Sequence, residues 1–578
     1  MADSNYSEKN VDISNISSQG HWTSQFVPTK AGTYQIYSQW KNSDNSTIQS
    51  QIETLTVYPG LSYMTCGIYG ANNQPIGKIE KDMVVYINGQ LSPQLSYETL
   101  TLKTIKPDKQ ESEISVSTSF GGKFSYVFLV DSEGEWQLSF CWGGNNDYEG
   151  CNSSQIKLYP GLEVGNALIV SGGGFGDDLS PCLEMLTRRF YSILLRRHFS
   201  HEMIYYISPG IASATYPVDD NFPEVNDIKQ YLESLYPEHT SGIINDNKQL
   251  IIYLADHGGN NKFLMNSLAS NEKLSASDLD QWLDIYQQKT GDMVIVIVES
   301  CYSGSFIDEL SPAIDQKRII ITSTEKDQQA IFDKTCSNNF SQYFFNFIES
   351  GENIKNSFQK AKDKMMGLKQ FFQDGTFKQF PQILDAMNLS QNSFIAGSYH
   401  IGDAMPSIEY NPTTDIHAGL FPLNVIIHDA EDAVTAWANI IPPNFIAPVI
   451  TNEFSTPVWD LDTVQLNPGQ QKDEYFGTYN FLYNGIYTVT IFARDSKEKM
   501  TSKEISFTVS DGEEPFIKGD INFDQQISIQ DAIIALKIIC GLQAPVAKGA
   551  GIDQSKIGLS DTIFVLRKVS GSLRTGQK

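Results

Sequence analysis

Two apolar runs decide the fold, and each ends in a chemically reactive residue: 249-QLIIYLADHGG-259 and 293-MVIVIVESCYSG-304. From about residue 164 to residue 402 such runs alternate with helical stretches, which predicts a doubly wound sheet of buried parallel strands. Active residues of open α/β sheets lie at the carboxyl ends of the strands. We therefore expect His257 and Cys301 to face one cleft.

A cysteine beside a histidine is the pairing used for nucleophilic catalysis. Cys301 would attack as a thiolate, and His257 would take up and return protons. The neighbouring glycines let a substrate approach the backbone closely. The N–H groups of Gly258 and Cys301 are then candidates to hold a developing oxyanion. Taken singly, each residue also fits a structural role, as a buried thiol or a turn histidine.

The two motifs together, Asp256-His257-Gly258-Gly259 and 299-ESCYSG-304, resemble those of the legumain-like peptidases, family C13 of the caspase-like cysteine peptidases. The resemblance covers residues 164–402 and implies a caspase-like α/β/α sandwich. It also implies a Cys–His dyad, with Cys301 as nucleophile and His257 as general acid and base. No further triad member can be assigned. Asp256 precedes His257 in a strand, so its side chain is expected to point away from the cleft.

The expected specificity pocket departs from the family pattern. Legumains carry an arginine shortly after the first strand, whereas this chain has an acidic stretch there with Asp177 and Asp178. Glu299 matches a glutamate of the legumain pocket, and Ser323 lies in a segment expected to form a pocket wall by family analogy. An acidic pocket favours a basic residue before the cut, so we expect cleavage after Arg or Lys, with Asn as the alternative. Asp177 and Asp178 also fit solvated loop carboxylates.

Alternating polar and apolar residues predict antiparallel sandwiches on both sides of this domain. Residues 32–40 and 134–142 form an internal repeat, with tryptophans expected in the core at Trp40, Trp136 and Trp142. We expect a partial immunoglobulin-like domain over residues 1–60, a complete one over 61–161, and another over 405–511. Because the first copy is short, the chain is expected to begin inside a domain.

The tail, residues 516–575, carries a cation-binding pattern. Oxygen-bearing side chains stand at the spacing by which a calcium loop wraps its ion, and a helix follows at once: Asp520, Asn522, Asp524, Gln526, Ser528 and Asp531. This resembles a dockerin repeat, which implies structural Ca²⁺ and a cohesin-like partner. A second copy ending at Asp561 has lost most of the pattern. The alternative is an Asx-rich turn that caps a helix.

Composition limits the class of protein. The 578 residues carry 42 Lys and Arg against 68 Asp and Glu, a net charge of −26, which argues against nucleic-acid partners and anionic membrane surfaces. No apolar run is long enough to span a membrane. The start lacks a signal-peptide core, which the truncated first repeat explains. Seven cysteines are too few for a disulfide scaffold, and a bridge between Cys141 and Cys151 is left open.

The sequence therefore predicts a multidomain cysteine endopeptidase that acts on protein or peptide substrates outside the cell or at its surface. It would consist of a caspase-like α/β/α domain flanked by all-β immunoglobulin-like sandwiches and a small α-helical calcium-binding module, with no cofactor in catalysis. One alternative is a surface adhesion or scaffold protein with an inactive peptidase-like domain. Another is a cytoplasmic caspase-like effector.

Overall fold

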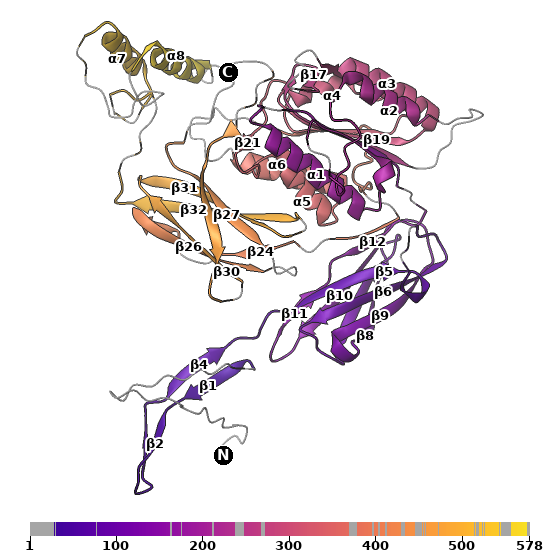
Figure 1. Cartoon of the computed structure of the whole chain (residues 1–578), viewed down its shortest axis with the longest axis vertical. Helices are drawn as coiled ribbons and strands as arrows, with labels where there is room; N and C mark the ends of the chain where they lie inside the picture. Colours follow the sequence, from indigo (N-terminus) through magenta and orange to yellow (C-terminus); the bar gives the residue numbers. More distant parts are fainter. Residues whose placement is uncertain are drawn as a thin grey trace. The chain divides into compact units, whose positions relative to one another are not determined.

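A computed structural model shows a mixed α/β chain with several separate sheets (Figure 1). It divides into two compact units, residues 1–76 with 80–158, and residues 77–79 with 159–578. The structure describes residues 28 and 30–574, except 75, 77, 162–163, 175, 211–212, 237–247, 267–271, 369–378, 396–397, 403–404, 411–412, 429–433, 446–453, 455, 457, 472, 497, 514, 516–518, 523, 525, 543 and 545–556.

The first unit is built from antiparallel strands. Its strands are β1 (Gly32–Ile36), β2 (Gln39–Lys41), β3 (Thr47–Gln49), β4 (Glu53–Val57), β5 (Tyr63–Tyr69), β6 (Met83–Ser92), β7 (Thr99–Ile105), β8 (Glu111–Ser117), β9 (Lys123–Val130), β10 (Trp136–Gly144), β11 (Glu149–Asn152) and β12 (Ile156–Leu158). β1 pairs with β4, and β2 with β3, in two small ribbons. Most side chains of these ribbons are exposed.

The strands from β5 to β12 enclose an apolar core. One sheet has the order β5-β6-β9, and β12, β10, β7 and β8 lie side by side in another. Rings from the two sheets meet at Phe124 with Phe140 and at Phe128 with Trp136. Trp136 and Trp142 are buried as expected. The expectation for Trp40 is wrong, because its side chain is 58% exposed on a two-stranded ribbon, and no second sheet among the described residues covers it.

The thiols of Cys141 and Cys151 are not bonded to each other. Cys141 pairs with Asn152 across the β10–β11 ladder, and Cys151 pairs with Trp142. Neighbouring positions on a strand point to opposite faces of the sheet, so this register keeps the two sulfurs apart.

The second unit contains the sheet predicted from the apolar runs. Its order is β14-β13-β15-β19-β20-β22, parallel except for the antiparallel edge strand β22. The bounds are β13 (Asn166–Ser171), β14 (Ile204–Ile207), β15 (Gln249–Ala255), β19 (Met293–Glu299), β20 (Arg318–Thr322) and β22 (Gln382–Leu384).

Helices cover both faces of this sheet (Figure 1). α1 (Ser180–Arg196), α5 (Phe340–Glu349) and α6 (Ile354–Leu368) pack on one face, against alternate strand residues such as Ile251 and Ile295. α2 (Val225–Ser234), α3 (Ala276–Thr290) and α4 (Phe306–Glu309) pack on the other, against the intervening residues such as Ile252 and Val296. Continuous apolar strands are required because neither face meets water.

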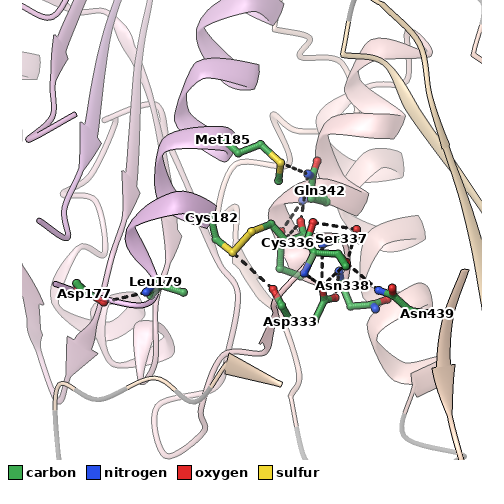
Figure 2. Close-up of a disulfide and its surroundings, with 12 residues drawn as sticks. Asp177, Leu179, Cys182, Met185, Asp333, Cys336, Ser337, Asn338, Gln342 and Asn439 are labelled. Atoms are coloured by element: carbon green, nitrogen blue, oxygen red, sulfur yellow. Dashed lines mark hydrogen bonds between the residues drawn. A yellow bond between two sulfur atoms is a disulfide. The ribbon is translucent and has the colours of Figure 1, made fainter. Parts of the chain in front are cut away.

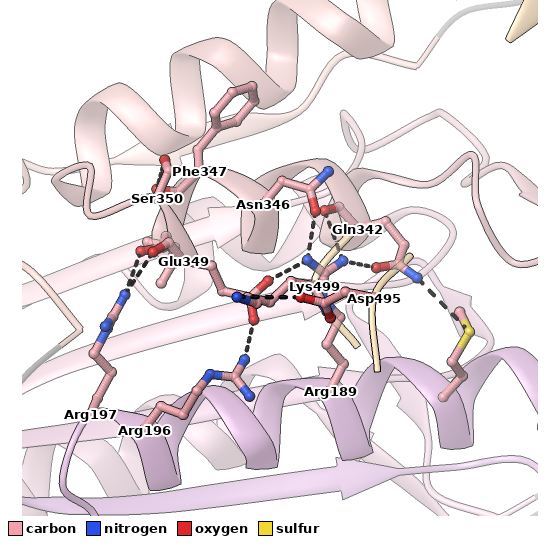
Figure 3. Close-up of polar contacts among 12 residues, drawn as sticks. Arg189, Arg196, Arg197, Gln342, Asn346, Phe347, Glu349, Ser350, Asp495 and Lys499 are labelled. Carbon is pink, nitrogen blue, oxygen red and sulfur yellow. Dashed lines mark hydrogen bonds and ion pairs between the residues drawn. The ribbon is translucent and has the colours of Figure 1, made fainter. Parts of the chain in front are cut away.

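A disulfide and a carboxylate fasten α1 to the rest of this layer. Cys182 of α1 bonds Cys336, which follows the short strand β21 (Phe332–Asp333) (Figure 2). Arg189 in the middle of α1 and Arg196 at its end both pair with the fully buried Glu349 of α5 (Figure 3). Two arginines on one buried carboxylate compensate its loss of hydration.

The region after the α/β sheet is again all β. Strands β24 (Ser407–Glu409), β25 (Asp415–His417), β26 (Gly419–His428), β27 (Thr435–Ile441), β29 (Asp462–Pro468), β30 (Glu474–Phe481), β31 (Gly485–Arg494) and β32 (Met500–Ser510) form one curled sheet. It encloses a core that includes Leu423, Val489 and Phe507.

Two segments tie this β region to the α/β sheet. β28 (Val458–Trp459) pairs in parallel with β21. Lys334 lies 2.7 Å from Asp460, and the Asn439 amide donates to Thr335. Cys336 lies three residues after β21. Its disulfide to Cys182 of α1 therefore holds in place the strand with which β28 pairs.

Two helices close the described chain, α7 (Ile529–Ile539) and α8 (Leu559–Arg574). Within the described residues, no helix is long and apolar enough to cross a membrane.

Candidate functional site

Three adjacent parallel strands each deliver one residue to the same edge of the sheet. β13, β15 and β19 are neighbours, and their carboxyl ends are in register. His257 follows the end of β15 by two residues, and Cys301 follows the end of β19 by two. Asp177 lies in the loop between β13 and α1. The sheet thus brings His257 near Asp177, which is 80 positions earlier in the chain, and near Cys301, which is 301 − 257 = 44 positions later.

His257 is held by a partner on each ring nitrogen. Nδ1 lies 2.9 Å from the hydroxyl of Thr456, and Nε2 lies 3.1 Å from a carboxylate oxygen of Asp177. Burial alone would lower the pKa of His257, but the hydrogen bond with Asp177 and the charges of Asp256 and Asp177 outweigh it. The pKa of His257 is therefore raised above its ordinary value.

Cys301 contacts the same hydroxyl of Thr456, from the side opposite His257. Its Sγ lies 3.3 Å from Thr456 Oγ1 and accepts from the Ala330 N–H, also at 3.3 Å. The residue is only 1% exposed, and burial raises the pKa of its thiol to about 11. His257 Nδ1 and the sulfur thus face each other across a single hydroxyl group. In this arrangement Cys301 is a protonated thiol at neutral pH.

Thr456 comes from the β region, 155 residues after Cys301. It is buried and lies two residues before β28, the strand that pairs with β21. The hydroxyl occupies the space between the thiol and the imidazole. A substrate carbonyl has to enter that space to be attacked, so the site is closed in this conformation.

Gly258 lies against the backbone that carries Cys301. A Cβ at this position would lie 2.2 Å from the Cys301 carbonyl oxygen, so no larger side chain fits. The close approach explains the glycine after the histidine. It also shows that the two residues whose N–H groups were predicted to hold an oxyanion are neighbours in space.

Of the residues expected to form a specificity pocket, Glu299 and Ser323 lie beside each other, whereas Asp177 and Asp178 lie in the loop after β13. Glu299 is fully buried and accepts from the Ser341 N–H at 2.6 Å, and burial raises its pKa to about 7. Ser323 is also fully buried, and its hydroxyl contacts both the N–H and the carbonyl of Ser300. Asp177 contacts His257, and Asp178 is exposed.

Asp256 lies beside these groups rather than away from them. One ligand atom each of Asp177, Asp256 and His257 falls within 4.8 Å of the other two. The expectation from strand alternation is wrong because β15 ends at Ala255, so the alternation no longer applies at Asp256.

The oxygen-rich tail loop leads directly into α7. Asp531 accepts from the N–H groups of Ile521, Asn522 and Ser528, and Ser528 and Asp531 form a capping box. Asp520 is buried and accepts from the Asp524 N–H at 3.0 Å. These contacts match the helix-capping alternative, and they also hold the oxygens in one loop.

The second copy of the tail pattern repeats the cap. Asp561 of α8 accepts from the Gly558 N–H at 2.6 Å, as Asp531 does from Ser528. The positions of this copy that align with the earlier ligands, 550, 552 and 554, lie outside the described residues.

Two contacts of the site were not predicted from the sequence. Asp177 was predicted for the specificity pocket, and nothing local assigned it to His257. Thr456 carried no signal, because it belongs to a region separated from both motifs by more than 150 residues.

Comparison with known proteins agrees with the two motifs. The model of the Peptidase C13 family matches residues 239–381, a range that contains both His257 and Cys301. The match supports a C13 peptidase domain. No curated protein matches the chain.

Likeness to solved structures is weak. The soluble domain of PmoD from Methylocystis sp. ATCC 49242 is 14% identical, with a TM-score of 0.12, over 18% of this chain and 89% of that one. A calcium-binding mutant of β-glucuronidase 2 from Bacteroides uniformis is 9% identical, with a TM-score of 0.16. That match covers 80% of this chain and 63% of the glucuronidase.

Proposed function

We propose that the chain is a cysteine endopeptidase in which Cys301, His257 and Asp177 act as a nucleophile, a general acid and base, and a positioning carboxylate. The observation that carries the proposal is the convergence of the three at neighbouring strand ends, with His257 Nδ1 facing the sulfur and Nε2 facing Asp177. The C13 family match across the two motifs supports the same class of enzyme.

Each group then has a defined task. The thiol of Cys301 passes its proton to His257 Nδ1, and the sulfur attacks the scissile carbonyl carbon. The oxyanion that forms accepts from the N–H groups of Gly258 and Cys301. The protonated Nδ1 then donates to the leaving amine, which leaves a thioester on Cys301. His257 next takes a proton from water, whose oxygen attacks the thioester and releases the acid.

Asp177 acts through the histidine. Its carboxylate accepts from Nε2–H and so leaves Nδ1 with the lone pair that faces the thiol. It also stabilises the imidazolium that forms when the thiol gives up its proton. The raised pKa of His257 agrees with this role.

The conformation described here is a resting one. The hydroxyl of Thr456 lies where the carbonyl group has to bind, and the Cys301 thiol is buried. The segment that carries Thr456 must therefore shift before a substrate binds. Displacing it would expose Cys301 to water and lower the pKa of its thiol.

The preferred residue before the cut remains the one predicted from the sequence, Arg or Lys, with Asn as the alternative. The remaining proposals also come from sequence. The tail would be a dockerin-like module that binds Ca²⁺ and a cohesin-like partner, and the enzyme would work outside the cell or at its surface.

Cleavage of a peptide library by the full chain and by Cys301→Ala tests the proposal. We expect cleavage by the wild-type chain that the variant lacks, with one residue type dominating before the cut. Equal cleavage by both proteins would contradict it.

A scaffold with an inactive peptidase-like domain is the second candidate, and the burial of Cys301 favours it. The two differ after the site is opened. A latent enzyme gains cleavage when Thr456 is displaced, whereas a scaffold does not.

A further inference from the structure

Asp256 is an anomaly in the core of the α/β domain. Its side chain is fully buried, and its carboxylate oxygens have no well-formed hydrogen bond in the described part of the chain, although the N–H groups of His257 and Gly173 lie near them. A buried carboxylate without a strong partner is costly and calls for an explanation such as a bound ion.

The space around Asp256 is shaped for its carboxylate. A Cβ on Gly172, at the end of β13, would lie 1.8 Å from Asp256 Oδ2, so only glycine leaves room there. The same oxygen-rich corner contains Asp177, whose side chain and that of His257 are each 11% exposed. The corner is therefore buried at Asp256 and reachable from solvent at Asp177 and His257.

The spacing of the three groups fits one cation. Their ligand atoms lie within 4.8 Å of one another, and this is the one group of three such side chains found among the described residues. Ligands 2.0–2.2 Å from a metal are separated from one another by roughly 3–4 Å. A small adjustment of these side chains would place all three around one ion.

The partners of His257 are compatible with a hydrogen on either ring nitrogen. In the proposed mechanism Nε2–H donates to Asp177, but the Thr456 hydroxyl, 2.9 Å from Nδ1, can equally accept a hydrogen from Nδ1. A metal-binding histidine usually donates its other ring N–H in this way. In this second tautomer Nε2 presents a lone pair toward the Asp177 carboxylate, and a metal ion between them would bond to both groups.

We propose that Asp177, Asp256 and His257 form a binding site for a divalent transition-metal cation of the Zn²⁺ type. One imidazole and two carboxylates suit Zn²⁺, which takes three protein ligands and a water in open sites. Ca²⁺ requires six to eight oxygen ligands, and Mg²⁺ prefers an oxygen octahedron. The ion would neutralise the two carboxylates and give the buried oxygens of Asp256 a strong partner.

Occupation of this site would switch off the proposed peptidase, a consequence that rests on the proposed function. With Nε2 bonded to the ion, the ring keeps its hydrogen on Nδ1 and has no lone pair to accept the proton of Cys301. Binding itself does not depend on catalysis, so the two proposals fail independently.

Zn²⁺ binding to the full chain, measured by competition with a chromophoric chelator in excess Ca²⁺, tests the site. Asp256→Asn and Asp177→Asn are each expected to weaken binding at least tenfold. Asp178→Asn is the matched control, because it makes the same substitution at the exposed neighbour of Asp177. It should bind Zn²⁺ as tightly as the wild-type chain does. Two ligand variants keep the test decisive if one of them fails to fold.

Zn²⁺ held directly between Cys301 and His257 is the competing arrangement. Cys301→Ala separates the two, because the proposed site keeps its affinity in this variant whereas the competing one loses it. Co²⁺ in place of Zn²⁺ should show no sulfur-to-metal charge-transfer band. Absence of binding to the wild-type chain, unchanged binding in Asp256→Asn, or loss of binding in Cys301→Ala would each overturn the proposal.

Discussion

The strand-end site and the tail loop are both clusters of reactive or oxygen-bearing side chains, but they are assembled differently. The tail loop draws its candidates from twelve consecutive positions, 520–531, and satisfies them largely with its own backbone N–H groups. The strand-end site gathers Asp177, Asp256, His257, Cys301 and Thr456 from segments far apart in the chain.

The difference determines what each cluster depends on. The tail loop needs only its local turn and the helix that follows it. The strand-end site needs the parallel register of three strands, and its closed state needs the β region that supplies Thr456. Changes at the strand-end site should therefore have large functional effects, and changes in the tail should stay local.

The largest effect is expected from Asp177→Asn. An asparagine cannot stabilise the imidazolium or fix the hydrogen of His257 as the carboxylate does, so kcat should fall by about 10²–10⁴-fold. KM should change little, because Asp177 acts through His257. Steady-state kinetics on the best library peptide measures both constants. Asp178→Asn is the matched control, and a kcat equally low in both variants would remove Asp177 from the mechanism.

The sequence predicted what depends on local pattern. Apolar runs predicted the buried strands and the helix after the tail loop. Short motifs at the strand ends predicted the positions of His257 and Cys301. Contacts that depend on tertiary packing have no local sequence pattern. They are the contact of Asp177 with His257, the contacts of Thr456 with His257 and Cys301, and the Cys182–Cys336 disulfide. The contact of the buried Glu299 carboxylate with the Ser341 N–H, at the start of α5, is another example. The pocket role of Glu299 stays a prediction.

Glu299→Gln should change how stability depends on pH. The pKa of Glu299 is raised from 4.5 to about 7 in the folded chain. Below pH 4.5 it is protonated in both states. Between pH 4.5 and 7 the unfolded chain loses this proton first, so the free energy of unfolding falls as pH rises. Glutamine does not titrate, so its contribution does not change with pH. From pH 4.5 to pH 7 the free energy of unfolding of the variant should therefore rise by about 2–4 kcal/mol relative to that of the wild type.

Urea unfolding followed by fluorescence at pH 4.5 and at pH 7.5 checks this shift. Asp256, whose pKa is raised similarly, is present in both proteins and cancels in the comparison. A stability difference that is the same at both pH values would show that Glu299 is ionised in the folded chain.

Ca²⁺ should stabilise the tail without affecting the strand-end site. If the loop binds Ca²⁺, a concentration one hundred times Kd adds about 2.7 kcal/mol to the stability of the tail. Limited proteolysis should then show protection of α7 by Ca²⁺, lost in Asp524→Ala. Asp415→Ala, an exposed aspartate outside the tail, is the control. Equal proteolysis with and without Ca²⁺ would leave the loop as a helix cap.

A smaller effect is expected from Thr456→Ala. Removing the hydroxyl deletes its contacts with Cys301 and His257, each of the order of 1 kcal/mol, and loosens the segment over the thiol. Alkylation of Cys301 by iodoacetamide should become about 5–10-fold faster, read by mass spectrometry of the peptide that contains Cys301. Thr435→Ala, at an exposed threonine of β27, should leave the rate unchanged. An unchanged rate in Thr456→Ala would mean that another group controls access.

An arginyl acyloxymethyl ketone, which reacts only with an activated cysteine nucleophile, tests whether Cys301 and His257 work as a pair. We expect a label on Cys301 that forms slowly in the wild-type chain, faster in Thr456→Ala, and not at all in the double variant Thr456→Ala/His257→Ala. The asparaginyl acyloxymethyl ketone tests the alternative preference for Asn before the cut. An unlabelled Cys301 with both reagents, or labelling that survives the loss of His257, would contradict a working Cys301–His257 pair.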